Sequence, residues 1–193
     1  LARDWCAMLM ATATKRWTLA EVHSLPDDGN KYELVRGELF VTPPPFPEHE
    51  TISARLTRIL DPYVEANRLG FVYRPRAVVR FEGSEVEPDL MVSQRIGTLG
   101  GDKAWNRAPT PILVVEVHSE YTRRRDKLQK RNLYMDAGVA EYWMIDPDRL
   151  TITAVRRDAA DVVFTTEVTW SPPGVSAPLT FDVARIFDWS SSA

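Results

Sequence analysis

The sequence predicts one α/β domain organised around a buried strand and the helix that follows it. Residues 112–115 form an unbroken apolar run, rich in β-branched side chains, that follows Pro111 and is typical of a strand buried on both faces. Residues 121–137 contain neither proline nor glycine and are followed by Gly138, which predicts a helix with a glycine stop. The chain has 193 residues, 44% of them hydrophobic and 26% charged, which suits one domain with a sizeable core.

The first third of the chain predicts a short extension, a hairpin and a helix. We expect residues 1–17 to be a poorly ordered extension ahead of a single domain over residues 18–193. A short amphipathic helical turn should follow Thr18, and two alternating segments joined across Arg36-Gly37 predict a β-hairpin, KYELVR and ELFVTP. A proline-rich link over residues 43–47 leads to a helix over residues 49–67, in which Pro62 predicts a kink or break.

The remaining elements alternate strands with turns. Three segments predict strands, FVYRP, AVVRF and PDLMVS, and residues 82–87 predict a turn between the last two. After the central strand and helix come AEYWMIDP and LTITAVR, a second hairpin-like pair, with a further strand within residues 161–168. The second pair is open to two interpretations, part of the core or an interface between two copies. Residues 179–187 carry enough apolar side chains to dock the tail on the core.

Composition excludes several classes of protein. A net charge of −3 argues against a protein that coats nucleic acid by charge alone. Cys6 is the single cysteine, so an internal disulfide framework is excluded and a reducing, cytoplasmic location is expected. No apolar run approaches the ~18 residues of a membrane span, so no membrane partner is expected.

Glu116 is the most unusual residue of the central strand. A carboxylate in a buried strand is costly unless it is paired or bound to a cation. In the following helix, Lys130 shares one face with Leu133, Tyr134 and Ala137, and that face should lie against the sheet. Opposite charges should therefore meet at one place, which is compatible with a structural salt bridge and with a functional site.

Other kinds of site find little support in the sequence. There is no G-x-S-x-G motif for a serine hydrolase. The histidines, His23, His49 and His118, show no zinc-ligand spacing with each other or with Cys6. No P-loop or dinucleotide fingerprint is present, so no nucleotide cofactor is expected.

Several motifs in order resemble a known nuclease family. Asp89 after a proline, Glu116 on a later strand and a nearby lysine resemble the PD-(D/E)xK nuclease superfamily. A finer resemblance, within residues 32–146, is to the Uma-two family of endonucleases. It is carried, in order, by YELVRGEL, the proline link to His49, PDLMV, VVEVHS, the spaced Asp126 and Lys130, Tyr134, and GVAEYWMID. This resemblance implies a restriction-endonuclease-like α/β fold, in which a mixed β-sheet is flanked by α-helices. It also implies a Mg²⁺-dependent (or Mn²⁺-dependent) endonuclease. Its substrate would be nucleic acid, with DNA expected.

The resemblance also implies roles for individual residues. Asp89 and Glu116 would hold Mg²⁺ with help from the backbone carbonyl of Val117, a set of hard oxygen ligands that suits this ion. The ion would lower the pKa of a bound water and neutralise charge on the scissile phosphate. His118 stands where the superfamily has its lysine, and in the Uma-like pattern that lysine is relocated to the next helix. Lys130 would then orient the attacking water or stabilise the transition state, and Lys127 is its rival.

Five further residues are candidates for the site or for the structure around it. Two of them have both a functional and a structural interpretation, and three have a structural one. Glu33 is either an additional metal or water contact or an exposed strand glutamate. His49 either caps a helix or contacts phosphate. Ser119 is expected to cap the helix that follows it. Tyr134 and Trp143 are expected to be core aromatics.

Expected partners follow from the same resemblance. A basic face could contact the nucleic-acid backbone or could be solvated, and its residues are Arg123, Arg124, Arg125 and Arg131. A homodimer is expected because cleavage of both strands of a duplex usually calls for two active sites. The competing function is a module that keeps the nuclease fold and binds nucleic acid or protein without turnover.

Overall fold

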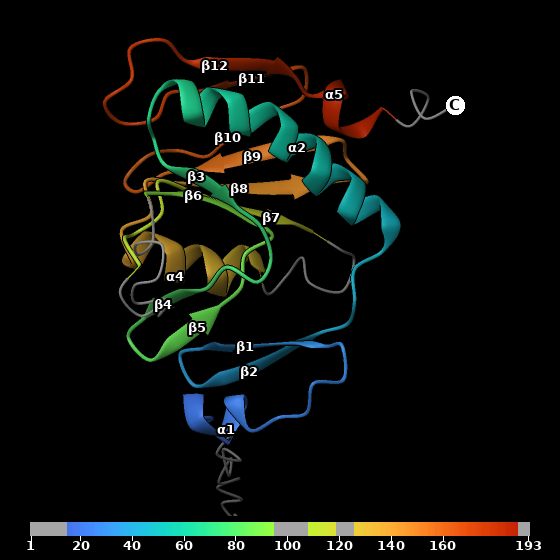
Figure 1. The fold of residues 1–193 in the computed structure, drawn as a ribbon, viewed down its shortest axis with the longest axis vertical. Helices are drawn as coiled ribbons and strands as arrows, with labels where there is room; N and C mark the ends of the chain where they lie inside the picture. The colour runs from blue at the N-terminus through green and yellow to red at the C-terminus, as the bar shows by residue number, and fades with distance from the viewer. Residues whose placement is uncertain (1–14, 95–107, 119–125, 189–193) are drawn as a thin grey trace, which may run out of the picture.

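The computed structural model of the chain describes residues 15–94, 108–118 and 126–188, and for residues 126 and 127 only the backbone. Most of the predicted extension, residues 1–17, lies outside the described residues, as does Ser119 with its predicted capping role. Within the described residues the chain forms an α/β fold with helices on both faces of a mixed sheet (Figure 1). The predicted fold class is confirmed.

A six-stranded mixed sheet forms the centre of the molecule. Its order is β10-β9-β8-β7-β6-β3. Strands β7 and β8 are parallel, and the other neighbours in the sheet are antiparallel. The strands are β3 (Phe71–Tyr73), β6 (Leu90–Ser93), β7 (Leu113–Val117), β8 (Glu141–Asp146), β9 (Thr151–Val155) and β10 (Val162–Phe164).

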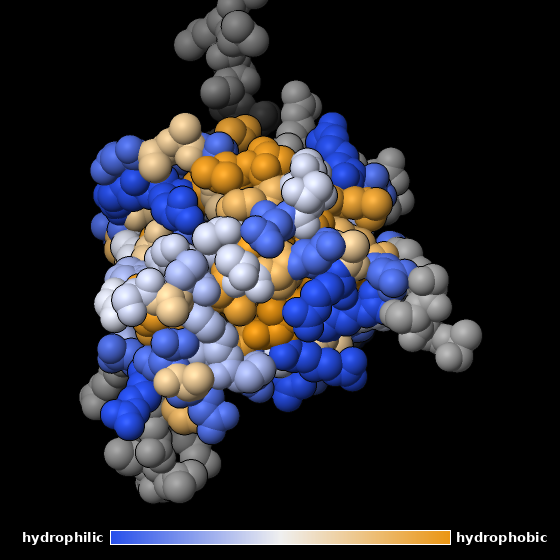
Figure 2. Space-filling view, turned by 90° about the horizontal axis from the view of Figure 1, so that it is seen from above, coloured by the Kyte–Doolittle hydropathy of each residue, from blue (hydrophilic) through white to orange (hydrophobic). Residues whose placement is uncertain are grey.

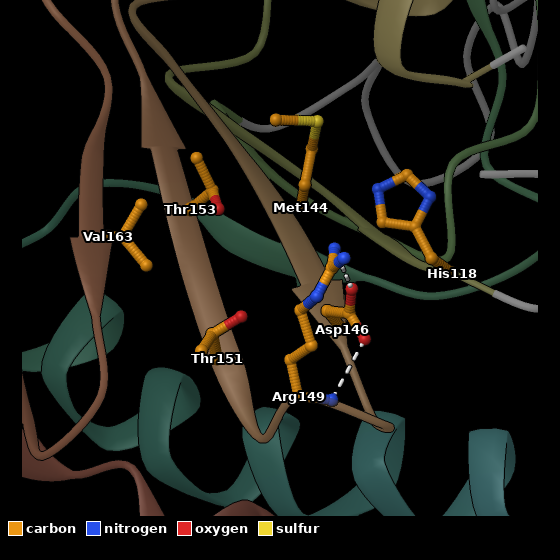
Figure 3. Close-up of a pocket in the computed structure, with 7 residues that line it drawn as sticks. All are labelled: His118, Met144, Asp146, Arg149, Thr151, Thr153 and Val163. Carbon is orange, nitrogen blue, oxygen red and sulfur yellow. Dashed lines mark hydrogen bonds and ion pairs between the residues drawn. The ribbon is translucent and has the colours of Figure 1, made fainter. Parts of the chain in front are cut away.

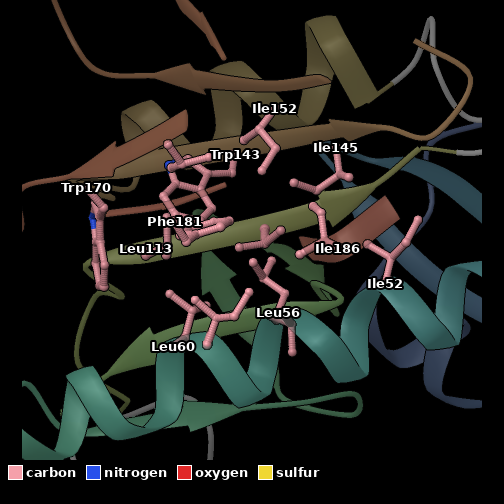
Figure 4. Packing of buried hydrophobic residues seen from close by; sticks show 14 of the residues in the cluster. Ile52, Leu56, Leu60, Leu113, Trp143, Ile145, Ile152, Trp170, Phe181 and Ile186 are labelled. Atoms are coloured by element: carbon pink, nitrogen blue, oxygen red, sulfur yellow. The ribbon is translucent and has the colours of Figure 1, made fainter. Parts of the chain in front are cut away.

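One face of this sheet packs against a long helix, α2 (Pro47–Ala66). Of the predicted kink or break at Pro62, the break is wrong, because the helix continues through Pro62 to Ala66, and the kink stays a prediction. Pro62 lies on the exposed side, while Leu60 and Val64 on the opposite side are buried against the sheet. Apolar packing on that side outweighs the hydrogen bond that proline removes. The same core includes Trp143, Trp170, Phe181 and Ile186 (Figure 4).

The C-terminal part of the chain closes this apolar layer. It consists of β11 (Glu167–Trp170), β12 (Leu179–Asp182) and α5 (Ala184–Phe187). The predicted docking of residues 179–187 is confirmed, since Phe181, Ile186 and Phe187 are buried. Seen from this side, hydrophobic residues at the surface are interspersed with hydrophilic ones (Figure 2).

The opposite face of the sheet is covered by a helix and a smaller sheet. The helical part comprises a π-helix, η2 (Asp126–Lys130), and α4 (Arg131–Asp136), which ends as predicted before Gly138 at φ 82°. The smaller sheet has the order β2-β1-β5-β4. Its strands are β1 (Lys31–Val35), β2 (Glu38–Thr42), β4 (Val79–Phe81) and β5 (Ser84–Val86).

The N-terminal hairpin forms as predicted. Arg36 and Gly37 both have positive φ, 50° and 84°, as a tight two-residue turn between β1 and β2 requires. Before it, α1 (Leu19–His23) begins with a capping box between Thr18 and Glu21. The expectation of a simple turn over residues 82–87 is wrong, because Ser84–Val86 forms β5 and joins β1 to β4.

The second hairpin, β8 and β9, belongs to the core. Every residue of β8 except Asp146 is buried, so the interpretation of this pair as an interface between copies is wrong. No helix among the described residues is both long enough and apolar enough to cross a membrane.

Candidate active site

Strand β7 brings Glu116 to the face covered by α4. Val115 and Val117 belong to the apolar core beneath α2, whereas Val114 belongs to the second core on the other face. Because side chains alternate along a strand, Glu116 shares the face of Val114. Leu90 pairs with Val115 in the adjacent antiparallel strand, which brings Asp89 level with Glu116. Both carboxylates are buried, with 5% and 3% exposure for Asp89 and Glu116.

Asp89 is held by three groups. The backbone N–H of Val117 donates to Oδ2 at 2.7 Å, and Nε2 of His49 lies 3.0 Å from the same oxygen. The ammonium of Lys31 lies 3.7 Å from Oδ1. His49 is the third residue of α2 and does not cap it, because the N-cap is Phe46. The structure therefore gives His49 a contact with the first candidate metal ligand.

Glu116 is held by two groups from the covering helix. Nζ of Lys130 lies 2.8 Å from Oε1, and the Tyr134 hydroxyl donates to the same oxygen at 2.6 Å. Lys130 is the last residue of η2 and is only 3% exposed. It faces the sheet, as its helical spacing indicated. The wider turn of a π-helix is often found at functional sites.

Glu33 completes the cluster from the N-terminal hairpin. Its Oε2 lies 3.0 Å from Nζ of Lys130, and its Oε1 accepts the backbone N–H of Glu87 at 2.8 Å. The interpretation of Glu33 as an exposed strand glutamate is wrong, since its exposure is 1%. Lys130 is thus shared between Glu33 and Glu116. If Glu116 turned to another cation, Lys130 would still have an anchor.

The charges of the cluster shift the pKa values of its members in opposite directions. Burial raises the pKa of Asp89, but Lys31, His49 and the Val117 N–H outweigh it and hold that pKa well below its usual range. Burial raises the pKa of Glu116 to about 7, against the opposing effect of Lys130. Asp89 is therefore held as a carboxylate, whereas Glu116 changes between its protonated and ionised forms near neutral pH.

The basic groups respond to the same neighbours. Burial lowers the pKa of Lys31, but Glu33, Asp89 and Glu116 outweigh that effect and leave the pKa raised. Burial likewise opposes a charged His49, yet its contact with Asp89 leaves the pKa of this imidazole raised. Perturbed pKa values gathered at one place are a common property of functional sites.

The donor set suits a hard cation such as Mg²⁺. Within the described part of the chain, Oδ1 of Asp89 and Oε2 of Glu116 accept no hydrogen bond, and Oδ1 has only a 3.7 Å ion pair with Lys31. The described residues hold no group of three or more His, Cys, Asp or Glu side chains that could form a metal cage. Mg²⁺ needs no such cage, because it is commonly bound by one or two carboxylates and several waters.

The structure does not bring every predicted site residue into the cluster in its predicted role. The backbone of Val117 contacts Asp89 through its N–H, and the predicted contact of its carbonyl with a metal ion stays a prediction. Arg131 forms a bidentate ion pair with Asp161, at 2.5 and 2.8 Å. The predictions for Arg123, Arg124, Arg125 and the Lys127 side chain fall outside the described residues.

Sequence reasoning missed two members of the cluster. Lys31 was read only as part of a hairpin strand, although its spacing of two from Glu33 places both on one strand face. Tyr134 was assigned to the core, and its ring is buried there, but its hydroxyl reaches Glu116. The available signal was its i, i+4 spacing from Lys130, which puts both polar ends at the same place.

Comparisons with known proteins agree with the fold and identify the family. The chain is similar over 90% of its length to a solved structure described as a "putative nuclease belonging to DUF820" from Anabaena variabilis. The two share 21% identity and a TM-score of 0.74, and the match covers 98% of that protein. No curated protein matches the chain. The model of the Uma2 family, described as "Putative restriction endonuclease", matches residues 19–184. The chain therefore belongs to the Uma2 family.

Proposed function

We propose that this protein is a metal-dependent nuclease that hydrolyses phosphodiester bonds of nucleic acid, with DNA as its substrate. The supporting observation is that Asp89, Glu116 and Lys130 are buried together, and that among the described residues Oδ1 of Asp89 and Oε2 of Glu116 accept no hydrogen bond. Buried charges rarely add net stability compared with apolar packing. A cluster of three acids and two lysines at one place is better explained by chemistry than by folding.

Several members of the cluster have a part in the proposed reaction. Mg²⁺, or Mn²⁺ in its place, would be held by Asp89 and Glu116 and would supply Lewis-acid stabilisation of the scissile phosphate. His49 and the Val117 N–H fix the orientation of Asp89. Lys130, anchored by Glu33, presents a fixed positive charge to the attacking water or to the developing phosphorane charge.

The direct test is a cleavage assay. Labelled plasmid, single-stranded DNA and RNA are each incubated with the protein in Mg²⁺, in Mn²⁺ and in EDTA. We expect cleavage of DNA that requires the metal, and its loss in Glu116→Gln and Lys130→Ala. Lys127→Ala is the matched control and should keep most of the activity. Equal activity of the wild type and Lys130→Ala would reject the assignment of Lys130.

A metal-binding measurement separates the nuclease from a module without turnover. Ligand binding to the folded state raises stability by about 2.7 kcal/mol when the ligand is at 100 times its Kd. Mg²⁺ should therefore raise the melting temperature of the wild type, and Glu116→Gln should abolish that rise. A protein with neither cleavage nor metal-dependent stabilisation would be the binding or interaction module instead.

We also propose that the nuclease acts as a homodimer. The basic residues proposed to contact the nucleic-acid backbone are Arg123, Arg124, Arg125 and Arg131. Two active sites in one particle would allow both strands of a duplex to be cut. Light scattering after size exclusion gives the mass of the particle directly. A monomer that linearises plasmid by cutting both strands at one encounter would contradict the dimer.

A further inference from the structure

A polar pocket lies beside the charged cluster of Glu33, Asp89, Glu116, Lys31 and Lys130. Its volume is about 200 Å³, and it opens over β8, β9 and the end of β7 (Figure 3). Its polar lining consists of His118, Asp146, Arg149, Thr151 and Thr153. Met144 and Val163 supply apolar walls. None of the roles proposed above uses this pocket.

The pocket continues the sheet face that carries Glu116. Glu116 pairs with Met144 across β7 and β8, and Met144 pairs with Thr153 across β8 and β9. Neighbouring strands are about 4.8 Å apart, so Thr153 lies about 10 Å across the sheet from Glu116. His118 follows Glu116 by two residues and shares its side of the sheet. A substrate bound at Glu116 can therefore reach the pocket.

The pocket also lies where α/β sheets commonly bind ligands. Strands β7 and β8 are parallel, and their carboxyl ends, near Val117 and Asp146, lie at the same edge of the sheet. Ligands of open α/β sheets bind outside the carboxyl ends of the strands. The candidate metal ligand Glu116 and the pocket residue Asp146 both lie near that edge.

The chemistry of the lining favours an anion. Within the described residues, the hydroxyls of Thr151 and Thr153 make no hydrogen bond to protein, and both can donate. The Arg149 side chain is 67% exposed, and its guanidinium lies 3.5 Å from Asp146. The Arg149 backbone N–H also donates to Asp146 at 3.0 Å. Asp146 contacts the guanidinium through a single 3.5 Å hydrogen bond, which holds Arg149 at the pocket and leaves most of its five N–H donors for a ligand.

The size of the pocket limits the group that it can take. Sites for whole cofactors and drug-sized ligands occupy roughly 300–1,000 Å³. A pocket of about 200 Å³ is smaller and suits a single group with several acceptor oxygens. We propose that it binds the phosphodiester group next to the scissile one in the same strand. Met144, which lies between Glu116 and Thr153 across the sheet, then contacts the sugar between the two phosphates.

This proposal deepens the proposed nuclease function, but its test does not need turnover. Binding of a short fluorescein-labelled single-stranded DNA is measured by anisotropy in EDTA at several salt concentrations. The double variant Thr151→Val with Thr153→Val keeps β-branched shape and removes both hydroxyls. A hydrogen bond to a charged group contributes about 1.5 kcal/mol or more, so affinity should fall about tenfold or more.

Arg149→Ala provides the second, independent measurement. Removing one phosphate contact should weaken binding and reduce the slope of log K against log salt by about 1. The matched control is Thr169→Val with Thr180→Val, a cross-strand threonine pair in β11 and β12, which should bind as the wild type does. Thr151→Ser with Thr153→Ser keeps the hydroxyls and should also bind normally.

Three results would overturn the proposal. The first is wild-type affinity in the Thr151–Thr153 valine variant, and the second is an unchanged salt slope in Arg149→Ala. The third is a loss of affinity that depends on the identity of one base, which would assign the pocket to a base. If the valine variant does not fold, the exposed Arg149 alone decides the outcome. A protein that binds DNA through this pocket but never cleaves it would refute the nuclease and leave the pocket standing.

Discussion

The two faces of β7 differ in polarity, one being apolar and the other charged. On one face, Val115 and Val117 pack with α2 in a core of apolar side chains. On the other face, Glu116 meets Lys130 and the hydroxyl of Tyr134, with Glu33 close behind. Both faces are almost fully buried, so water does not explain the difference. One strand therefore carries an apolar face and a charged face on alternating residues.

The comparison teaches where the fold tolerates charge. Burying an unpaired ion costs several kcal/mol, and the cluster limits that cost by giving each acid a cation or an N–H donor. Lys130 serves two acids, while Asp89 is served by Lys31, His49 and a backbone amide. The α2 face needs no such balance. We therefore expect substitutions on the two faces to differ in how they respond to metal.

Loss of Lys130 should have the largest effect on stability. Lys130→Met removes the charge that Glu33 and Glu116 share and leaves two buried carboxylates without it. Breaking a buried pair in this way costs about 3–5 kcal/mol. Mg²⁺ should recover part of the loss by compensating Glu116. Urea unfolding with EDTA and with Mg²⁺ measures both values, and a loss that is the same in the two solutions would contradict metal binding at Glu116.

A large-to-small substitution on the apolar face is the matching experiment. Leu56 is fully buried beneath the sheet, and Leu56→Ala should lower the free energy of unfolding by about 2–5 kcal/mol. That loss should be equal in EDTA and in Mg²⁺, because no charge changes. If Mg²⁺ reduced the cost of Leu56→Ala as much as that of Lys130→Met, the two faces would not be separate in function.

Tyr134→Phe tests the smaller polar contact within the cluster. It removes the hydroxyl that donates to Glu116 at 2.6 Å and leaves the ring in place against Tyr142. We expect a loss of about 1.5 kcal/mol in urea unfolding, typical of one hydrogen bond to a charged group. Tyr32→Phe is the control, because it breaks a Tyr–carboxylate bond to Asp28 at 2.8 Å on the surface. Equal losses in the two variants would show that burial adds nothing to this contact.

Sequence periodicity predicted the part of the site that lies on regular elements. The alternation along β7 and the helical spacing of Lys130 with Leu133 and Tyr134 fixed which side chains face each other. The sequence alone therefore predicts that Glu116 and Lys130 lie at one place. The central strand, both hairpins and the docked tail follow from the same kind of pattern.

Features that depend on tertiary packing were not accessible in this way. The docking of β1 against the main sheet buries Glu33 and brings Lys31 to Asp89, and no local pattern specifies that docking. Likewise, α2 continues through Pro62 because the sheet holds its buried side, and β5 forms because β1 and β4 both pair with it. The local sequence instead predicts a kink or break at Pro62 and a turn over residues 82–87.

The smallest expected effect belongs to a carboxylate in water, outside both faces of β7. Hydrogen bonds from Thr18 and the nearby Lys15 hold the pKa of Glu21 below its usual value of 4.5. A lowered pKa in the folded state means that this carboxylate stabilises α1 fully above pH 4.5, and that the stabilisation is lost as pH falls from 4.5 through the lowered pKa. Glu21→Gln should therefore lower the melting temperature slightly at pH 7, and its difference from the wild type should shrink as the pH falls below 4.5, as followed by circular dichroism. A difference that grew on acidification would reverse the sign and contradict the capping box as its source.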